Sequence, residues 1–181
     1  KVDLHPAYIA KSFFPTALLR QAGLTAIGSR TIRVRPRKDL RKKAPPECES
    51  TQLFIAGTRE AFARLPSFAT QISDNTKEAL QFAEIEDFST MTAADRVRTS
   101  TLPPGHTFEV GLHLLPDQSV DALRKAFVRY AKTCEFEVNS EFDFPVGRML
   151  FLAAIGEAAQ LQRLAQFSLL RVVRPMPLIR G

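Results

Sequence analysis

Residues 2–23 read VDLHPAYIAKSFFPTALLRQAG, and residues 110–131 read VGLHLLPDQSVDALRKAFVRYA. Both segments begin with Val-x-Leu-His, reach a serine and continue into a stretch rich in alanine and leucine. A second pair follows in the same order, with QLFIAGTREAFARLPSF at residues 52–68 and MLFLAAIGEAAQLQRLAQF at residues 149–167. Because the matches keep their order in both halves, they predict a tandem duplication.

Each half has the hydrophobic pattern of a β-α-β-β-α-β unit. In the first half the pattern predicts strands at 2–9, 31–35, 52–56 and 80–88, and helices at 15–22 and 58–69. In the second half it predicts strands at 107–115, 135–144, 148–155 and 169–174, and helices at 120–130 and 157–167. This order is typical of a four-stranded antiparallel sheet with both helices on one face.

The predicted fold is therefore α+β, with two tandem ferredoxin-like modules at residues 1–90 and 107–174. Residues 91–106 are polar and contain Pro103-Pro104, so they are expected to form a linker. Residues 175–181 are expected to form an extended tail. His5 and His113 should lie at matching places in the first strand of each module.

The positive charge of the chain is concentrated in one segment. Residues 30–43 contain eight basic residues and one acidic residue, whereas the rest of the chain contains 17 basic and 18 acidic residues. Two interpretations stay open, a solvated strand edge and loop, or a docking surface for an acidic partner or nucleic acid. The candidate docking patch consists of Arg33, Arg35, Arg37, Lys38, Arg41, Lys42 and Lys43.

The sequence indicates no catalytic residue, no cofactor site and no metal site. It contains no Gly-x-Ser-x-Gly, Walker or Gly-x-Gly-x-x-Gly motif. Cys48 and Cys134 lie in unrelated contexts, so no disulfide framework is predicted. There is no run of 18 apolar residues, which argues against a membrane-spanning segment. QLFIAGT and MLFLAAI lack the aromatic pattern of RNA-binding sheets, which argues against nucleic acid as a partner.

Four segments, VDLHPAYIAKSFFPTALL, GLTAIGSRTIRVRP, TQLFIAGTREAF and LAQFSLLRVVRPMPLIR, give the chain a family resemblance. They resemble the N-terminal region of bacterial S8 (subtilisin-like) serine peptidases, of the cytoplasmic type often encoded beside an AAA ATPase. The resemblance implies a prodomain-like, regulatory and folding-assisting region in the bacterial cytoplasm. It also implies a peptidase domain after Gly181, and a cognate AAA ATPase as a further partner. None of the peptidase triad motifs occurs in these 181 residues.

The same resemblance gives the C-terminal segment two interpretations. Prolines favour extended backbone and reduce the entropy lost on binding. The tail is then either a product-like occupant of the peptidase cleft or only a linker. The candidate cleft residues are Pro175, Met176, Pro177, Leu178, Ile179 and Arg180.

Two other functions compete with this reading. The chain could be a free-standing tandem regulatory module that binds a small ligand or a protein partner. An RNA-binding module is the third alternative.

Overall fold

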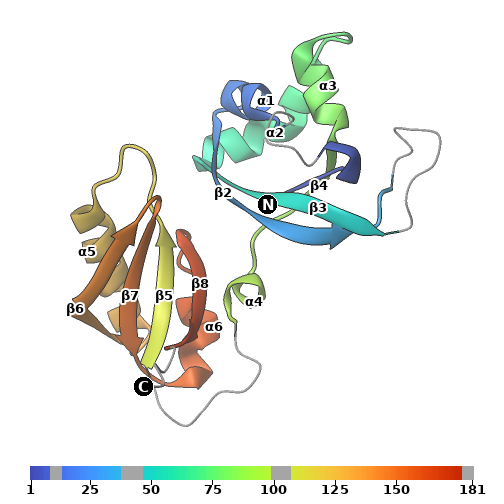
Figure 1. The fold of residues 1–181 in the computed structure, drawn as a ribbon. Coiled ribbons are helices and arrows are strands. Elements are labelled where there is room, and N and C mark those ends of the chain that lie inside the picture. Colours follow the sequence, from blue (N-terminus) through green and yellow to red (C-terminus); the bar gives the residue numbers. More distant parts are fainter. Residues whose placement is uncertain (9–13, 38–46, 99–106, 177–181) are drawn as a thin grey trace. The chain divides into compact units, whose positions relative to one another are not determined.

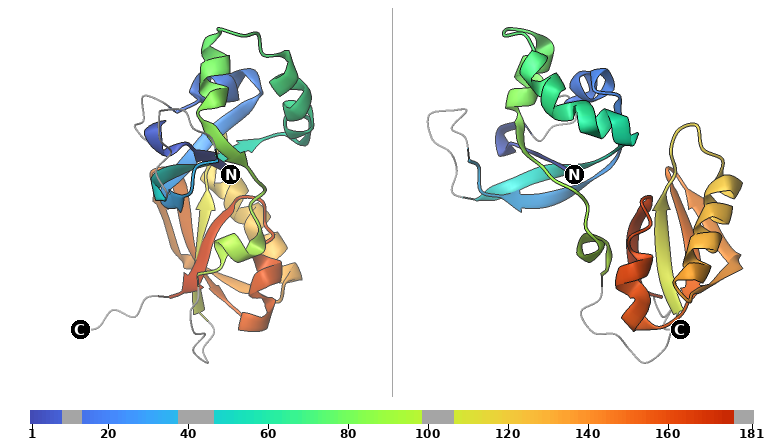
Figure 2. Two further views of the ribbon diagram at one scale, coloured as in Figure 1. Left: turned by 90° about the vertical axis from the view of Figure 1, so that its right-hand side faces the viewer. Right: turned by 180° about the vertical axis from the view of Figure 1, so that it is seen from behind.

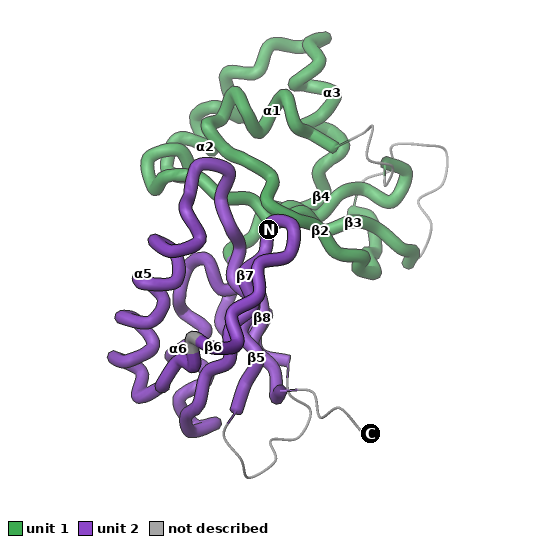
Figure 3. The backbone as a smooth tube through the Cα atoms, turned by 60° about the vertical axis from the view of Figure 1, so that its left-hand side comes forward, with its two compact units in different colours: residues 1–90 green, residues 91–181 purple. Residues whose placement is uncertain are grey.

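The computed structural model describes residues 1–8, 14–37, 47–98 and 107–176. Over these residues the chain is a mixed α+β protein with two four-stranded antiparallel sheets and six α-helices (Figure 1). In both units the main helices cover one face of the sheet, as the views in Figure 2 show. The chain divides into two compact units, Lys1–Thr90 and Met91–Gly181 (Figure 3). Each unit has its own hydrophobic core.

The first unit has the strand order β2-β3-β1-β4. Its strands are β1 (Val2–Leu4), β2 (Leu24–Val34), β3 (Cys48–Gly57) and β4 (Ile85–Phe88). Its helices are α1 (Thr16–Gln21), α2 (Arg59–Gln71) and α3 (Lys77–Ala83), with a 3-10 turn, η1 (Pro6–Tyr8). Gly23, at φ +73°, follows α1 and turns the chain into β2, in a conformation that glycine adopts without strain.

The predicted strand at 80–88 is wrong in its first half. Thr76 accepts a hydrogen bond from the Ala79 amide at 3.1 Å, so it caps a helix that runs through Leu80 to Ala83. The strand begins only at Ile85. The other predicted strands of this half exist with shifted ends. The first strand stops at Leu4 because Pro6 begins a 3-10 turn.

The second unit has the strand order β6-β7-β5-β8. Its strands are β5 (Thr107–His113), β6 (Glu137–Val146), β7 (Met149–Ile155) and β8 (Leu170–Pro175). Its helices are α4 (Ala93–Arg96), α5 (Val120–Thr133) and α6 (Leu161–Leu164), with a 3-10 turn, η3 (Ala158–Gln160). The predicted helix at 157–167 is thus divided into η3 and a single turn of α6.

Helix α5 follows directly from its sequence. The Ser119 side chain accepts a hydrogen bond from the Ala122 amide at 3.0 Å and caps the helix. Leu123, Phe127 and Ala131 are spaced four residues apart, so they share one helix face, and all three are fully buried. This face packs on the sheet and forms the centre of the second core.

The first part of the expected linker at 91–106 belongs to the second unit instead. Arg96 is buried and its guanidinium donates to the carbonyls of Ala165 at 2.6 Å and Phe167 at 2.9 Å. Val97 forms a parallel bridge to Val173 of β8, and Ala93 and Val97 pack on the second core. Polar composition therefore misled the linker prediction, because one arginine and two small apolar residues hold this segment. Residues 99–106 lie outside the described part of the chain.

The two histidines make equivalent backbone contacts, although His5 directly follows β1 whereas His113 is the last residue of β5, so the prediction that both lie in the first strand holds only for His113. The His5 amide donates to the Glu84 carbonyl at 2.8 Å, and the His113 amide donates to the Leu169 carbonyl at 2.8 Å. Each acceptor directly precedes the last strand of its unit. Both imidazoles are buried, with 3% of each residue exposed.

Candidate docking face

The second sheet has one face that its helices do not cover. Leu150, Leu152 and Ala154 of β7 point into the core. Because side chains alternate along a strand, Met149, Phe151, Ala153 and Ile155 lie on the opposite face. We call one apolar region of this open face, made of Phe142, Phe144, Val146, Met149, Phe151 and Val172, the docking face.

Strand β6 contributes the most exposed members of the docking face. Phe142 is 62% exposed, Phe144 is 64% exposed and Val146 is 47% exposed. Phe144 pairs with Phe151, and Val146 pairs with Met149, so these residues share the face of β7 that points away from the core. A group of neighbouring exposed apolar side chains of this kind is typical of a surface that binds another protein.

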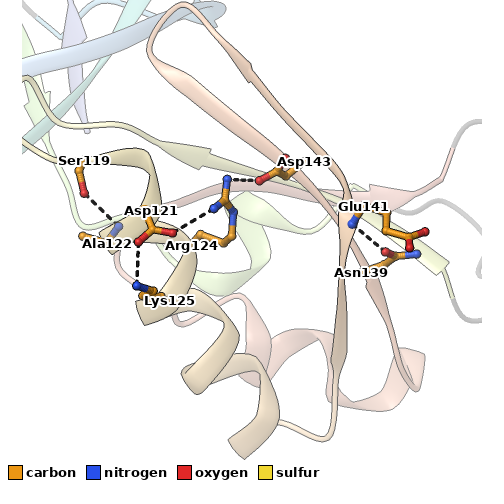
Figure 4. A network of polar contacts seen from close by, with 8 residues as sticks. All are labelled: Ser119, Asp121, Ala122, Arg124, Lys125, Asn139, Glu141 and Asp143. Atoms are coloured by element: carbon orange, nitrogen blue, oxygen red, sulfur yellow. Dashed lines mark hydrogen bonds and ion pairs between the residues drawn. The ribbon is translucent and has the colours of Figure 1, made fainter.

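An ion pair with α5 fixes which way this part of β6 faces. Arg124 contacts the carboxylate of Asp143 on the helix side of the sheet (Figure 4). Since Asp143 lies between Phe142 and Phe144, its attachment to α5 directs both aromatic rings to the opposite face. Arg124 also donates to Asp121 at 3.1 Å, and Lys125 lies 2.8 Å from the same carboxylate. Hydrogen bonding and charge from Lys125, with the charge of Arg124, lower the pKa of Asp121.

Gly111 allows the apolar side chains to close over the middle strand. A methyl group at this position would lie 3.0 Å from Val172 Cγ1, 3.1 Å from Met149 Cε and 3.1 Å from Phe151 Cε1. These distances are too short for ordinary van der Waals contact, so any side chain at this position would push its neighbours apart. The absence of a side chain therefore makes the patch continuous from β7 across β5 to β8.

The candidate basic patch is only partly within the described residues. Arg33, Arg35 and Arg37 are exposed at and beyond the end of β2. Arg33 lies 3.6 Å from Glu47, and Arg37 lies 3.8 Å from Asp87. Lys38, Arg41, Lys42 and Lys43 lie outside the described residues. The described arginines are thus available at the surface, although two of them already have acidic neighbours.

The candidate tail begins later than expected. Pro175 is the last residue of β8 and pairs with Phe108, and the Met176 amide donates to the Thr107 carbonyl at 3.0 Å. The first two tail candidates are therefore part of the sheet. Pro177, Leu178, Ile179 and Arg180 lie outside the described residues.

In the described part of the chain, the titratable groups are not brought together in a catalytic arrangement. His5 Nε2 lies 3.7 Å from Glu86 Oε1, so the buried His5 imidazole has a polar neighbour. Desolvation, followed by the charges of Arg171 and Arg96, lowers the pKa of His113 to about 4. Among the described residues no group of three or more His, Cys, Asp or Glu side chains could hold a metal ion. Cys48 is half-buried and Cys134 is buried.

Helices on one side of a sheet leave its other face free, as the sequence predicts, but the alternation at residues 135–144 did not identify which residues form the docking face. Phe136, Val138, Phe142 and Phe144 alternate with polar residues, which predicts one face for all four. In the structure Val138 pairs with the core residue Ala154, whereas Phe144 pairs with Phe151 on the open face. The register is irregular between Asn139 and Phe144, and this irregularity moves the later aromatic residues to the other face. The sequence contains no signal of this irregularity, because from Phe136 to Phe144 the apolar residues keep to even-numbered positions and the charged residues to odd-numbered ones.

No helix within the described ranges is long and apolar enough to cross a membrane. Comparison with known proteins adds no assignment, because no protein-family model, curated protein or solved structure matches the chain.

Proposed function

We propose that this chain is the non-catalytic N-terminal region of a subtilisin-like serine peptidase, which it inhibits and helps to fold. Its two units are then tandem ferredoxin-like modules that resemble subtilisin propeptides. The peptidase domain follows residue 181 in the same polypeptide, and the pair acts in the bacterial cytoplasm with a cognate AAA ATPase.

The docking face is the observation that carries this proposal. An inhibitory module must cover a protein surface, and the exposed Phe142, Phe144 and Val146 provide a contiguous apolar surface for that purpose. Strand β8 is an edge strand of the same sheet and ends at Pro175. A segment that continues from β8 is therefore attached to the module that bears the docking face.

The tail completes the proposed inhibition. An extended segment in a peptidase cleft gains main-chain hydrogen bonds in the manner of an added strand. Residues 177–181 are the part that remains for this role, because Pro175 and Met176 are held by β5. If they only link the two domains, the docking face alone accounts for the inhibition.

Inhibition of the separately produced peptidase domain tests the proposal. Three proteins are compared against one peptide substrate: residues 1–181, residues 1–176, and the 1–181 variant Phe144→Asp. Phe144→Asp should weaken inhibition by about tenfold or more, since covering one large apolar side chain stabilises a complex by roughly 1.5–3 kcal/mol. Because Phe144 is exposed in the free protein, the variant should keep the thermal stability of the parent.

The outcomes separate the parts of the proposal. Equal inhibition by residues 1–181 and 1–176 would make the tail a linker. Absence of both inhibition and faster refolding of the peptidase domain in the presence of residues 1–181 would contradict the proposed function.

The exposed arginines at and beyond the end of β2 support a second contact with an acidic partner, either the ATPase or the peptidase domain. Replacing Arg33, Arg35 and Arg37 with serine should weaken this association, and the loss should shrink as salt rises. Association that is equally strong in parent and variant across a salt series would contradict this part of the proposal.

A further inference from the structure

The two sheets carry matching rows of residues with opposite chemistry. In the second sheet one row runs across all four strands, from Phe144 through Phe151 and Gly111 to Val172. In the first sheet the corresponding row runs from Arg30 through Gln52 and Asp3 to Asp87. The row in the second sheet contains no charged residue, whereas the row in the first sheet contains three.

The correspondence of these rows rests on the register of each sheet. The pairing of β1 with β4 is irregular between Asp3 and Leu4, and the pairing of β5 with β8 is irregular between Gly111 and Leu112. The repeated Val-x-Leu-His pattern, at residues 2–5 and 110–113, places Asp3 at the position of Gly111. The remaining members of each row follow from the strand pairs that these two residues make.

The charged row of the first unit is engaged in polar contacts of its own. Gln52 Nε2 donates to Asp3 Oδ1 at 2.6 Å, and Arg37 lies 3.8 Å from Asp87. The guanidinium of Arg30 lies 5.5 Å from the centre of the Phe54 ring. An apolar partner surface placed on this row would remove water from the carboxylates without replacing it, which is unfavourable.

We infer that the chain binds one peptidase domain, through the second unit alone, although it carries two copies of the same topology. This inference rests on the proposed function and specifies its stoichiometry and the unit responsible. The tether supports the choice of occupant. Val172 belongs to the row and lies three residues before the end of β8, so a domain that follows in the same polypeptide is held at high local concentration near this face.

Gly111 is the position in the middle strand at which the second unit differs from the first, which has Asp3 there. An aspartate there reproduces the residue of the first unit, adds a charge and separates Phe151 from Val172. We expect Gly111→Asp to weaken binding by about 100-fold, a change that corresponds to about 2.7 kcal/mol. Phe144→Arg likewise introduces the residue of the first unit, Arg30, but at an exposed position. It should weaken binding by about tenfold or more without affecting folding. The matched control, Arg30→Ala in the first unit, should change binding by less than about threefold.

Site-specific photocrosslinking in the complete 1–181 chain tests the inference directly. A photoreactive phenylalanine analogue replaces Phe144 in one protein and Arg30 in another, and each is irradiated with the separate peptidase domain. The expected result is a crosslink from position 144 only, together with one peptidase domain per chain by calorimetry and native mass spectrometry.

The remaining outcomes are distinguishable. A crosslink from position 30, or two peptidase domains per chain, would overturn the inference and leave the proposed function intact. If the unmodified chain neither inhibits nor binds the peptidase domain, and neither position crosslinks, both the inference and the proposed function fail.

Discussion

Arg96 gives the most specific prediction about how the second unit is held together. Only 7% of the residue is exposed, and its guanidinium donates to the carbonyls of Ala165, Phe167 and Ser168 at 2.6, 2.9 and 3.4 Å. These carbonyls lie at and just beyond the C-terminal end of α6, where backbone acceptors lack partners within the helix.

The magnitude follows from these contacts. A hydrogen bond from a charged donor contributes about 1.5–3 kcal/mol, and the bonds to Ala165 and Phe167 are short enough to count fully. Their gross contribution is thus roughly 3–6 kcal/mol. Part of it is offset because burial of the guanidinium is unfavourable, which is also why its pKa is lowered. We expect Arg96→Met, which keeps the apolar stem, to lower the free energy of unfolding of the second unit by about 2–3 kcal/mol.

The assay is thermal and urea unfolding combined with amide hydrogen exchange. For a unit of about 90 residues, 2–3 kcal/mol corresponds to a Tm decrease of roughly 8–24 °C. The Arg98 amide, which donates to Val173 at 2.8 Å, should exchange faster in the variant because the segment at 93–98 is released. Arg98→Ala removes an exposed neighbouring arginine and is the matched control. A change below about 0.5 kcal/mol in Arg96→Met, with unchanged exchange at Arg98, would refute this reasoning.

Three further predictions concern the second unit. The free energy of unfolding of the unit should fall by roughly 3 kcal/mol as the pH is lowered from about 6.5 to about 4. The reason is that the His113 pKa is about 4 in the folded protein, so the unfolded chain binds the proton first. Urea unfolding across this pH range should show a smaller pH dependence for His113→Gln. Phe127→Ala should destabilise the unit by about 3–5 kcal/mol through a cavity in a fully buried site, whereas Leu80→Ala, at a residue 66% exposed in the first unit, should cost less than about 0.5 kcal/mol; similar losses in calorimetry would contradict the assigned core. Ser119→Ala should cost about 1 kcal/mol by removing the cap of α5, and helicity followed by circular dichroism should show Ser119→Asp to be close to the parent.

Much of the architecture could be predicted from the sequence because its signals are local. The amphipathic spacing of Leu123, Phe127 and Ala131, with Ser119 before it, defines α5 without reference to any other element. In the repeated Val-x-Leu-His segments, His5 and His113 make equivalent backbone contacts. Most of the strands and the helices α1, α2 and α5 follow from such patterns, since each depends on neighbours within one or two turns, whereas α3 and α4 were not predicted.

The register in which the strands pair could not be predicted from the sequence. The sequence repeat aligns Leu53 with Leu150, whereas the sheets place Leu53 opposite Val2 and Leu152 opposite the equivalent Val110. The second hairpin is thus displaced by two residues relative to the sequence alignment. A slide of two residues keeps every side chain on its face, so the hydrophobic pattern cannot reveal it.

The sequence by itself therefore predicted an α+β fold with two antiparallel sheets, most of the strands and the helix face of α5 that forms the second core. Only the tertiary structure decided that Phe142 and Phe144 leave the core side that Val138 occupies, because an irregular pairing in β6 interrupts the alternation and Arg124 holds Asp143 on the helix side. Only the tertiary structure assigned Arg96 to the end of α6, 69 residues further along the chain. Both depend on contacts between segments far apart in sequence, and the periodicity of a single segment contains no information about its partner in space.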